Sequence, residues 1–458
     1  MKLDKPFKGY FKPPGADTRK VCGQVDFDPI QGVQLSTIDS FVKKSGWQVD
    51  EQRWDCIHGC STSGKHLTLL NCKGHESTSI PGFPEGKFWG ARLLVGLEPF
   101  DPSQPCVKST AFRLSYLKAW LNISGVHVDE NTQGNFRVSH THPGKIEIYR
   151  GDRFSMSIWH RTVVPISRSP DFLERFKEEP FINVDYKELA SVEQVVEDML
   201  MLRDLLSVWV VAPVAVEEAS VYLEGDAGDE TRRFDLYFPL GYDPPTRPDV
   251  NRRHMPFPYE DLEVKIQDAI DRWVDLYPKI KPGILFYHEA YFSKGRHAFQ
   301  KFADYTFSYE SINRVLHEMK ELPEEEYEAL RTKILQELEG AQRTFIKRVL
   351  QYANEGSLRK RLKQSFARFG LANERNNEAV REHINRMVQA RNNIVHGAEV
   401  NSENTVSSEN VVNYNVLLRI LIYAELLLAI GLVEQGSTER IRRNPHLAHV
   451  LHSTIDAS

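Results

Sequence analysis

The stretch GYDPPTRPDVNRRHMPFP (Gly241–Pro258) divides the chain into two parts of different character. It contains five prolines, and proline fixes φ and lacks the N–H group that helices and sheets need. Before it the chain is rich in short alternating runs bounded by turn-forming residues. After it, helical periodicity dominates. The stretch therefore predicts a linker, and the chain is predicted to be α+β, with a β-rich part followed by a helical part.

The part before the linker resembles a series of antiparallel strands in its composition. Runs of β-branched and aromatic residues bounded by Gly, Pro, Asn and Asp are typical of such strands. The predicted strands are Val21–Phe27, Gly32–Ile38, His66–Cys72, Ala91–Leu97, Lys145–Arg150 and Phe234–Leu240. Two apolar stripes with helical spacing predict helices at Phe112–Leu121 and Ser191–Trp209. Residues 1–250 are thus expected to form a sandwich-like β domain with a few helices.

The part after the linker is predicted to be all-α. The expected helices are Tyr259–Leu276, His288–Lys320, Pro323–Tyr352, Ser357–Arg368, Asn376–His396 and Val411–Val433. Pro278 and Pro282 are expected to end the first of them, because proline breaks a helix interior. Residues 251–285 then form the linker and a connecting helix, residues 286–440 a helical bundle, and residues 441–458 a C-terminal tail.

Composition and charge restrict the class of protein. The 458-residue chain is 41% hydrophobic and 26% charged with a net charge of −5, so any nucleic-acid contact must be local. The longest apolar run, Val416–Val433, holds Arg419 and Glu425 in its middle, where charge is most costly in lipid. It is therefore predicted to be a buried bundle helix, with no membrane contact. Five cysteines and no apolar leader predict a cytoplasmic location.

A polar motif ends one of the predicted helices. In QARNNIVHGAEV (Gln389–Val400), helical phase places Arg391 on the apolar face that carries Ile384, Met387 and Ile394. A guanidinium on such a face needs a carboxylate or an anion, and a phosphate fits its two-pronged donor geometry. Arg391 is therefore a candidate phosphate-binding residue.

The residues after this arginine extend the candidate site. His396 occupies the last helical turn, and histidine titrates in the range needed to move protons in RNA cleavage. Asn392 adds an amide beside it. If the helix packs against its copy in a homodimer, two such sets meet in one cleft. The alternative is structural: Arg391 pairs with a buried acid such as Glu310, and His396 only interacts with the helix dipole.

This motif resembles that of HEPN (higher eukaryotes and prokaryotes nucleotide-binding) domains. The likeness covers Phe286–Glu434 and consists of Arg-Asn-x3-His-Gly at a helix end, a polar loop and a very apolar final helix. The preceding half resembles the N-terminal domain of ApeA-type abortive-infection proteins. The segments that carry this second likeness are FKGYFKPP, VCGQVDFDPIQGVQLSTI, GCSTSGKHLTLLNC and FRLSYLKAWLNISG.

The resemblance implies a function. HEPN domains of this kind are similar to dimeric, metal-independent endoribonucleases, and ApeA-like proteins resemble antiphage systems that cleave host RNA, with tRNA an expected target. Carried over to this chain, the catalytic residues are Arg391, Asn392 and His396. No metal or other cofactor is expected. The N-terminal domain is expected to have a sensor or regulatory role and to gate the nuclease until a phage-derived protein triggers it, because it makes up a large non-catalytic half and a free ribonuclease would be toxic. The alternative is a non-catalytic HEPN module for dimerisation or binding, with a ligand-binding β domain.

A basic segment offers a candidate RNA-binding surface. Residues 341–370 carry eight Lys and Arg against one acid, and the charge is densest at Arg359, Lys360, Arg361 and Lys363. Such a segment can follow an RNA backbone, because most of the affinity for nucleic acids comes from their phosphates. A solvated helix face is an equally good interpretation of the same charges.

Two clusters of potential metal ligands also stand out. Cys56, His58, Cys60 and Cys72 could hold zinc, but the paired Cys-x2-Cys spacing of a structural zinc site is absent. Buried cysteines in β structure more often behave as small hydrophobic residues. His140 and His142 lie on one face of a predicted strand without an evident third ligand. Neither cluster is taken as a metal site.

Overall fold

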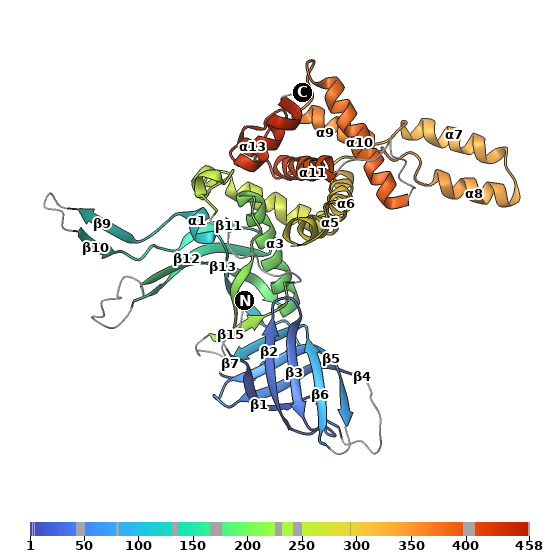
Figure 1. Cartoon of the computed structure of the whole chain (residues 1–458). Coiled ribbons are helices and arrows are strands. Elements are labelled where there is room, and N and C mark those ends of the chain that lie inside the picture. The colour runs from blue at the N-terminus through green and yellow to red at the C-terminus, as the bar shows by residue number, and fades with distance from the viewer. Residues whose placement is uncertain are drawn as a thin grey trace. The chain divides into compact units, whose positions relative to one another are not determined.

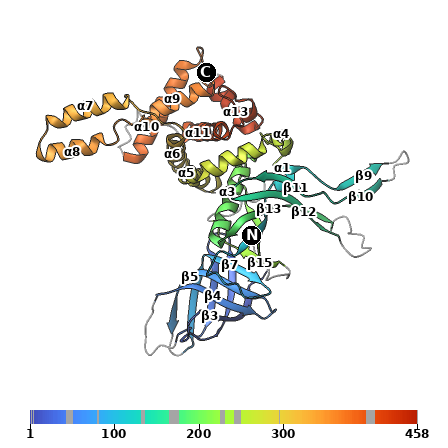
Figure 2. The same ribbon diagram turned by 180° about the vertical axis from the view of Figure 1, so that it is seen from behind.

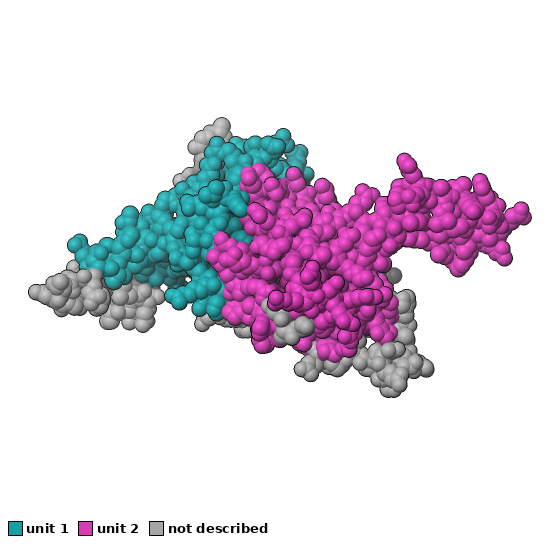
Figure 3. All heavy atoms as spheres, turned by 90° about the horizontal axis from the view of Figure 1, so that it is seen from above, with its two compact units in different colours: residues 1–267 teal, residues 268–458 magenta. Residues whose placement is uncertain are grey.

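The computed structural model describes residues 1, 3, 5–42, 51–78, 82–130, 136–164, 176–224, 231–240, 250–293, 295–396 and 408–456. The chain divides into two compact units, residues 1–267 and residues 268–458 (Figure 3). The first unit is rich in strands and the second is helical, as the sequence predicts. The division falls inside a helix and within the segment 251–285 that was expected to connect the two parts.

Six strands of the first unit close into an antiparallel barrel (Figure 1). Strand β5 pairs with both β4 and β6, so the ring β1–β2–β3–β6–β5–β4 has no free edge. Inward-facing residues alternate with exposed ones along each strand, which explains the alternating pattern of the sequence. The strands are β1 (Phe7–Lys12), β2 (Val21–Asp28), β3 (Gly32–Ile38), β4 (Glu51–Ser61), β5 (His66–Thr78) and β6 (Pro84–Gly90).

Aromatic rings inside the barrel pack against glycines of the neighbouring strand. A Cβ atom added to Gly59 would lie 2.5 Å from the ring of Phe11, and one added to Gly74 would lie 2.5 Å from the ring of Phe88. Both rings are at most 1% exposed. The glycines therefore leave the space in which these large side chains lie over the neighbouring strand.

The same sheet continues beyond the barrel as an open sheet. The first half of β5 pairs with β7, and the order then runs β7–β15–β14–β8–β13–β12–β11. The predicted sandwich-like arrangement is thus replaced by one continuous 13-stranded sheet, because β5 is shared by the closed and open parts. The strands are β7 (Arg92–Gly96), β8 (Val107–Leu114), β11 (Ile146–Arg150), β12 (Phe154–Val163), β13 (Lys177–Ala190), β14 (Val216–Leu223) and β15 (Arg232–Tyr237).

Helices cover one face of the open sheet. Helix α3 (Val192–Val210) begins at Ser191, whose side chain accepts a hydrogen bond from the backbone N–H of Gln194. Trp209 at its end stacks on Trp120 of α1, with ring centroids 5.3 Å apart. A separate two-stranded ribbon completes the unit. The additional elements are α1 (Leu117–Leu121), β9 (Val126–Glu130), β10 (Phe136–His140), η1 (Arg252–His254) and α4 (Tyr259–Leu262).

Two expectations for this unit are wrong. The predicted helix Phe112–Leu121 is the end of strand β8 followed by the short helix α1, because Phe112 and its neighbours are paired on both sides within the sheet. The described second half of the proline-rich stretch is not a free linker. Met255 and Phe257 are at most 3% exposed, and the indole of Trp120 donates to the carbonyl of Phe257.

The second unit is a helical bundle with an appended helical hairpin (Figure 2). Its central helices α6 and α11 lie against each other. Short C-terminal helices pack on α11, so the expected tail belongs to the bundle. The elements are α5 (Ile266–Phe292), α6 (Ala298–Leu316), α7 (Glu324–Gln336), α8 (Gly340–Leu350), α9 (Leu358–Arg368), α10 (Asn377–His396), α11 (Ser408–Ala429), α12 (Glu439–Arg442), α13 (Pro445–Leu451) and η2 (His452–Asp456).

The first helix of this unit continues through two prolines, which contradicts the prediction. Helix α5 contains both Pro278 and Pro282. Trp273, Ile280 and Ile284 on either side of the prolines are at most 1% exposed. Packing of this apolar stripe outweighs the local cost of proline, which is about 3 kcal/mol per residue in a helix interior.

Two other predicted helices have different ends. The helix expected at His288–Lys320 is interrupted near Gly295, whose φ is +80°, so α5 ends and α6 begins there. The helix expected at Pro323–Tyr352 is split near Gly340, whose φ is +55°, into the antiparallel helices α7 and α8. In both places a glycine in the left-handed region reverses the chain.

Helix α11 is the apolar core helix that the sequence predicts. Its residues Asn410–Ala429 are long and apolar enough to cross a membrane by length and composition, but about 78% of this stretch is buried within the protein. Leu421 and Leu427 are completely buried. Such burial is what the core helix of a bundle requires.

Candidate functional site

Helix α10 positions the polar motif. Val380, Ile384 and Met387 are at most 2% exposed and form the predicted apolar stripe on the bundle. Helical continuation of that stripe brings Arg391 to its edge, where the side chain of the arginine is 27% exposed. The arginine is thus anchored by a buried helix face but remains accessible from solvent.

Arg391 forms a loose ion pair with helix α6. One guanidinium nitrogen lies 3.7 Å from a carboxylate oxygen of Glu310, and another donates to Oδ1 of Asn392 at 3.4 Å. A separation of 3.7 Å is longer than a hydrogen bond, and the buried Nε atom of Arg391 has no hydrogen-bond partner among the described residues. The pairing with Glu310 is the structural alternative that the sequence left open. Within the described part of the chain, it leaves most of the donors of the guanidinium without an acceptor.

The remaining motif residues lie at the C-terminal end of the same helix. Asn392 is exposed and adjoins Arg391. His396 is the last residue of α10, but its side chain lies outside the described residues. The backbone therefore places Arg391 and His396 five residues apart on one helix, and the relation of their side chains stays a prediction.

The basic helix α9 brings together only part of the predicted RNA-binding set. Arg359 and Lys363 are exposed and one helical turn apart, so they share a face. Lys360 donates to the carbonyl of Lys320 at 2.6 Å and lies 3.3 Å from Glu321. Lys360 is therefore partly engaged within the protein.

Arg361 lies inside the bundle, in contrast to the other basic residues of α9. It is 3% exposed, and its guanidinium donates to the carbonyl of Gly356 and to Oδ1 of Asn313, both at 3.0 Å. A buried guanidinium with these acceptors holds helices together and is not accessible to an RNA backbone. Arg361 is therefore removed from the candidate RNA surface.

A buried polar network centred on Glu425 joins α6, α9 and α11. The carboxylate of Glu425 is 1% exposed and accepts hydrogen bonds from Ser365 and Arg368, both at 2.5 Å. His317 lies 2.8 Å and Asn313 3.3 Å from the same carboxylate. Burial favours its neutral form, but the hydrogen bonds of His317 and Ser365 and the charge of Arg368 lower the pKa of Glu425 on balance.

Sequence reasoning missed this network, although two signals were present. Glu425 stands within the most apolar run of the chain, where an acid needs partners. Tyr309, Asn313 and His317 repeat every four residues and therefore share one face of α6. The hydroxyl of Tyr309 extends the network by a 2.7 Å hydrogen bond to Ser365.

The cysteine cluster is not arranged as a zinc site among the described residues. The sulfur of Cys56 lies 3.4 Å from Nε2 of His58, while the Cys60 thiol is exposed and donates to the carbonyl of Ser61. Burial raises the pKa of the Cys72 thiol to about 12. No group of three potential metal ligands is found in the described part of the chain.

The histidine pair is also engaged within the protein. Nε2 of His140 lies 2.9 Å from the buried carboxylate of Glu178, and Nε2 of His142 lies 2.8 Å from the carbonyl oxygen of His160. Glu178 also accepts a hydrogen bond from the backbone N–H of Gly125. These contacts attach the β9–β10 ribbon to strands β12 and β13.

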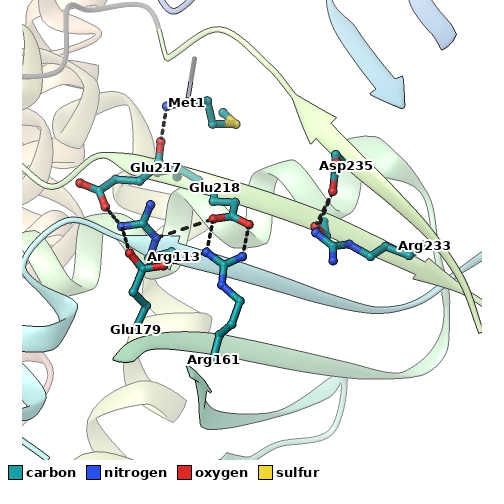
Figure 4. A network of polar contacts seen from close by, with 10 residues as sticks. Met1, Arg113, Arg161, Glu179, Glu217, Glu218, Arg233 and Asp235 are labelled. Carbon is teal, nitrogen blue, oxygen red and sulfur yellow. Dashed lines mark hydrogen bonds and ion pairs between the residues drawn. The ribbon is translucent and has the colours of Figure 1, made fainter. Parts of the chain in front are cut away.

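A network of ion pairs lies on the open sheet (Figure 4). Arg161 contacts Glu218 at 2.6 Å and Glu179 at 2.7 Å, while Arg113 contacts Glu217 at 2.6 Å. Burial alone would raise the pKa of Glu179, but the two arginines lower it on balance. A cavity of about 200 Å³ beside this network is lined by further charged residues, Lys118, Lys177 and Glu178 among them. The charges compensate one another and join β8, β12, β13 and β14.

Comparison with known proteins adds two family matches. The model described as ApeA N-terminal domain 1 matches residues 6–273, and the model described as Apea-like HEPN matches residues 305–435. No curated protein and no solved structure gives a significant match. The first match covers the strand-rich unit. The second contains helix α10 with its arginine and histidine.

Proposed function

Since this chain belongs to the ApeA family of HEPN-containing defence proteins, we propose that it is a metal-independent endoribonuclease that cleaves host RNA during phage infection. HEPN domains are generally ribonucleases that bind RNA and commonly dimerise. The observation that carries the proposal is Arg391, five residues before His396 on α10, whose partly exposed guanidinium has donors without acceptors among the described residues.

The proposed reaction is attack by the ribose 2′-hydroxyl. A base removes the 2′-hydroxyl proton, the oxygen forms a bond to the adjacent phosphorus, and the bond from phosphorus to the 5′-oxygen breaks. An acid protonates that oxygen, which leaves a 2′,3′-cyclic phosphate and a 5′-hydroxyl end. His396 would transfer protons, Arg391 would neutralise the phosphoryl oxygens, and Asn392 would orient them. A homodimer would supply both proton-transfer groups.

Glu310 would act as a resting partner of the catalytic arginine. An ion pair at 3.7 Å between partly exposed groups contributes only about 0–1 kcal/mol. A phosphate that accepts two hydrogen bonds from the guanidinium binds it more strongly than this carboxylate does. The substrate phosphate would therefore replace Glu310 at Arg391, while Glu310 keeps the guanidinium oriented before RNA binds.

Other parts of the chain would serve binding and control. Arg359 and Lys363 on the exposed face of α9 would contact the RNA backbone, with Lys360 assisting. The strand-rich unit would hold the nuclease inactive until a phage-derived protein binds it. We propose tRNA as the substrate and the cytoplasm as the place of action.

The proposal is tested by incubating the purified full-length protein with total tRNA in EDTA. We expect fragments with cyclic-phosphate ends. Their formation should fall by at least about 100-fold in Arg391→Ala and His396→Ala, as is usual when a group that stabilises the transition state is removed. Arg386→Ala is the matched control, because Arg386 lies on the same helix and forms a surface ion pair with Glu382.

The ion pair of Arg391 with Glu310 also favours a second candidate, a non-catalytic module for dimerisation or RNA binding. In that case no fragments form in any variant, and Arg391→Ala instead lowers the thermal stability of the helical unit. Absence of cleavage by a dimeric, folded wild-type protein, with and without phage extract, would contradict the nuclease proposal.

A further inference from the structure

Arg419 stands in a tyrosine-lined cluster of the helical unit. Its guanidinium carbon lies 4.7 Å from the ring centroid of Tyr291, and the guanidinium lies beside the hydroxyl of Tyr305. Tyr287 joins these two rings, with centroid distances of 5.7 Å to Tyr291 and 6.0 Å to Tyr305. Among the described residues no ion pair links Arg419 to an acid, and its Nε atom is buried without a hydrogen-bond partner.

A second cation lies close to Arg419. Lys301 precedes Tyr305 by one turn on α6 and therefore shares its face. Burial and then the charges of Arg419 and Arg296 lower the pKa of Lys301, so the ammonium is near like charges. Arg296 forms ion pairs with two acids, Glu289 and Asp304, the latter at 2.6 Å. For Lys301, as for Arg419, no direct ion pair with an acid is found in the described part of the chain.

Two neighbouring cations without a counter-charge destabilise the protein unless an anion lies between them. A guanidinium fork, an ammonium and tyrosine hydroxyl groups together provide the donors that a tetrahedral oxyanion requires. The nearby tyrosine rings add faces on which a nucleobase can stack. Lys301, Arg419 and Tyr291 are partly exposed, while Tyr305 is buried, so a ligand would approach from the side of Lys301.

We propose that Arg419, Lys301 and Tyr305 form a phosphate-binding site for a nucleotide or an RNA strand. This site is separate from the motif on α10. Lys301 and Glu310 are nine residues apart on α6, which places them about 180° apart around the helix axis. Glu310 and its partner Arg391 therefore lie on the opposite side of α6. The inference does not depend on the proposed ribonuclease activity.

Isothermal titration calorimetry with the full-length protein tests this site. Inorganic phosphate is titrated at fixed ionic strength, with chloride as the blank. We expect saturable binding that Lys301→Gln weakens at least tenfold. Arg419→Lys should also weaken it, because lysine keeps the charge but loses the forked donor geometry. Arg331→Gln should bind like the wild type, since Arg331 is also partly exposed but forms an ion pair with Glu328.

If substitutions at Arg419 unfold the bundle, Lys301→Gln still tests the site. Because Lys301 is partly exposed, the Lys301→Gln variant should have the same melting curve as the wild type. Absence of saturable phosphate binding, or equal binding by wild type and Lys301→Gln, would overturn the proposal. Two further titrations distinguish whether the bound phosphate belongs to a nucleic-acid strand or to a free nucleotide. Tighter binding of an all-2′-deoxy oligonucleotide than of 5′-AMP identifies a nucleic-acid strand, and the reverse identifies a free nucleotide.

Discussion

Removing the charge of the buried Glu425 carboxylate should destabilise the helical unit by an amount that its contacts allow us to predict. In Glu425→Gln the shape of the side chain is kept, but its charge is removed. Arg368, 13% exposed, and His317, 25% exposed, then lose their anion. The amide can still accept from one neighbour, while its NH2 group faces donors such as the Arg368 guanidinium. The substitution therefore leaves a largely buried cation without a partner.

The expected magnitude follows from these contacts. Removing one partner of a buried ion pair costs roughly 3–5 kcal/mol. We take about 3 kcal/mol, because both cations of this network are partly hydrated. For a unit of the size of residues 268–458, 1 kcal/mol corresponds to about 2–4 °C in Tm. Glu425→Gln should therefore lower the Tm of the helical unit by about 6–12 °C.

Thermal unfolding followed by circular dichroism at 222 nm measures this change, because the helical unit contributes most of that signal. Glu434→Gln is the control, since Glu434 is exposed and a surface substitution changes stability by less than about 0.5 kcal/mol. A second readout is pH. The folded pKa of Glu425 is lowered, so its contribution is present above about pH 4.5 and is lost as the pH falls. If Glu425→Gln melts like Glu434→Gln, the network does not stabilise the bundle.

Three further predictions concern other parts of the chain. In Gly59→Ala the new Cβ would clash with the Phe11 ring, so the protein should lose about 1–3 kcal/mol of stability. Urea unfolding followed by tryptophan fluorescence should then show a lower midpoint. An unchanged midpoint would contradict the packing described for the barrel. The exposed Cys22 thiol should react with a disulfide reagent at pH 8 within minutes, whereas Cys72, with its pKa raised to about 12 by burial, should react only on unfolding; equal rates would refute this. Glu310→Gln should lower the KM for tRNA severalfold, because the substrate phosphate no longer competes with a carboxylate for Arg391. A raised KM would contradict the role of Glu310 as a resting partner of Arg391.

The strands of the barrel were partly predictable because their signal is local. Val21–Phe27 and Gly32–Ile38 alternate inward and outward residues, and both are strands in the structure. Closure of the barrel was not predictable in this way. It depends on the pairing of β1 with β4 and of β3 with β6, which join segments distant in the sequence. Local periodicity carries no information on such partners.

The helical half shows where local rules fail. Pro278 was expected to end a helix, but the buried residues around it continue the helix because tertiary packing outweighs propensity. For the candidate site, helical phase alone predicted that Arg391 lies against the bundle and named Glu310 as a possible partner. The burial of Arg361 was not predicted, since its charge gave no sign of the acceptors, such as the Asn313 side chain, that neighbouring helices supply.

The long strand β5 has a practical consequence for dissecting the molecule. Its residues His66–Leu70 pair with β7, while Lys73–Thr78 pair with β6. A fragment that stops at residue 90 would keep the six strands of the barrel but leave one stretch of β5 with unsatisfied amide and carbonyl groups. Such an edge invites a neighbouring molecule to add a strand and aggregate. Expression of soluble fragments should therefore succeed only when the whole sheet is retained as a single piece.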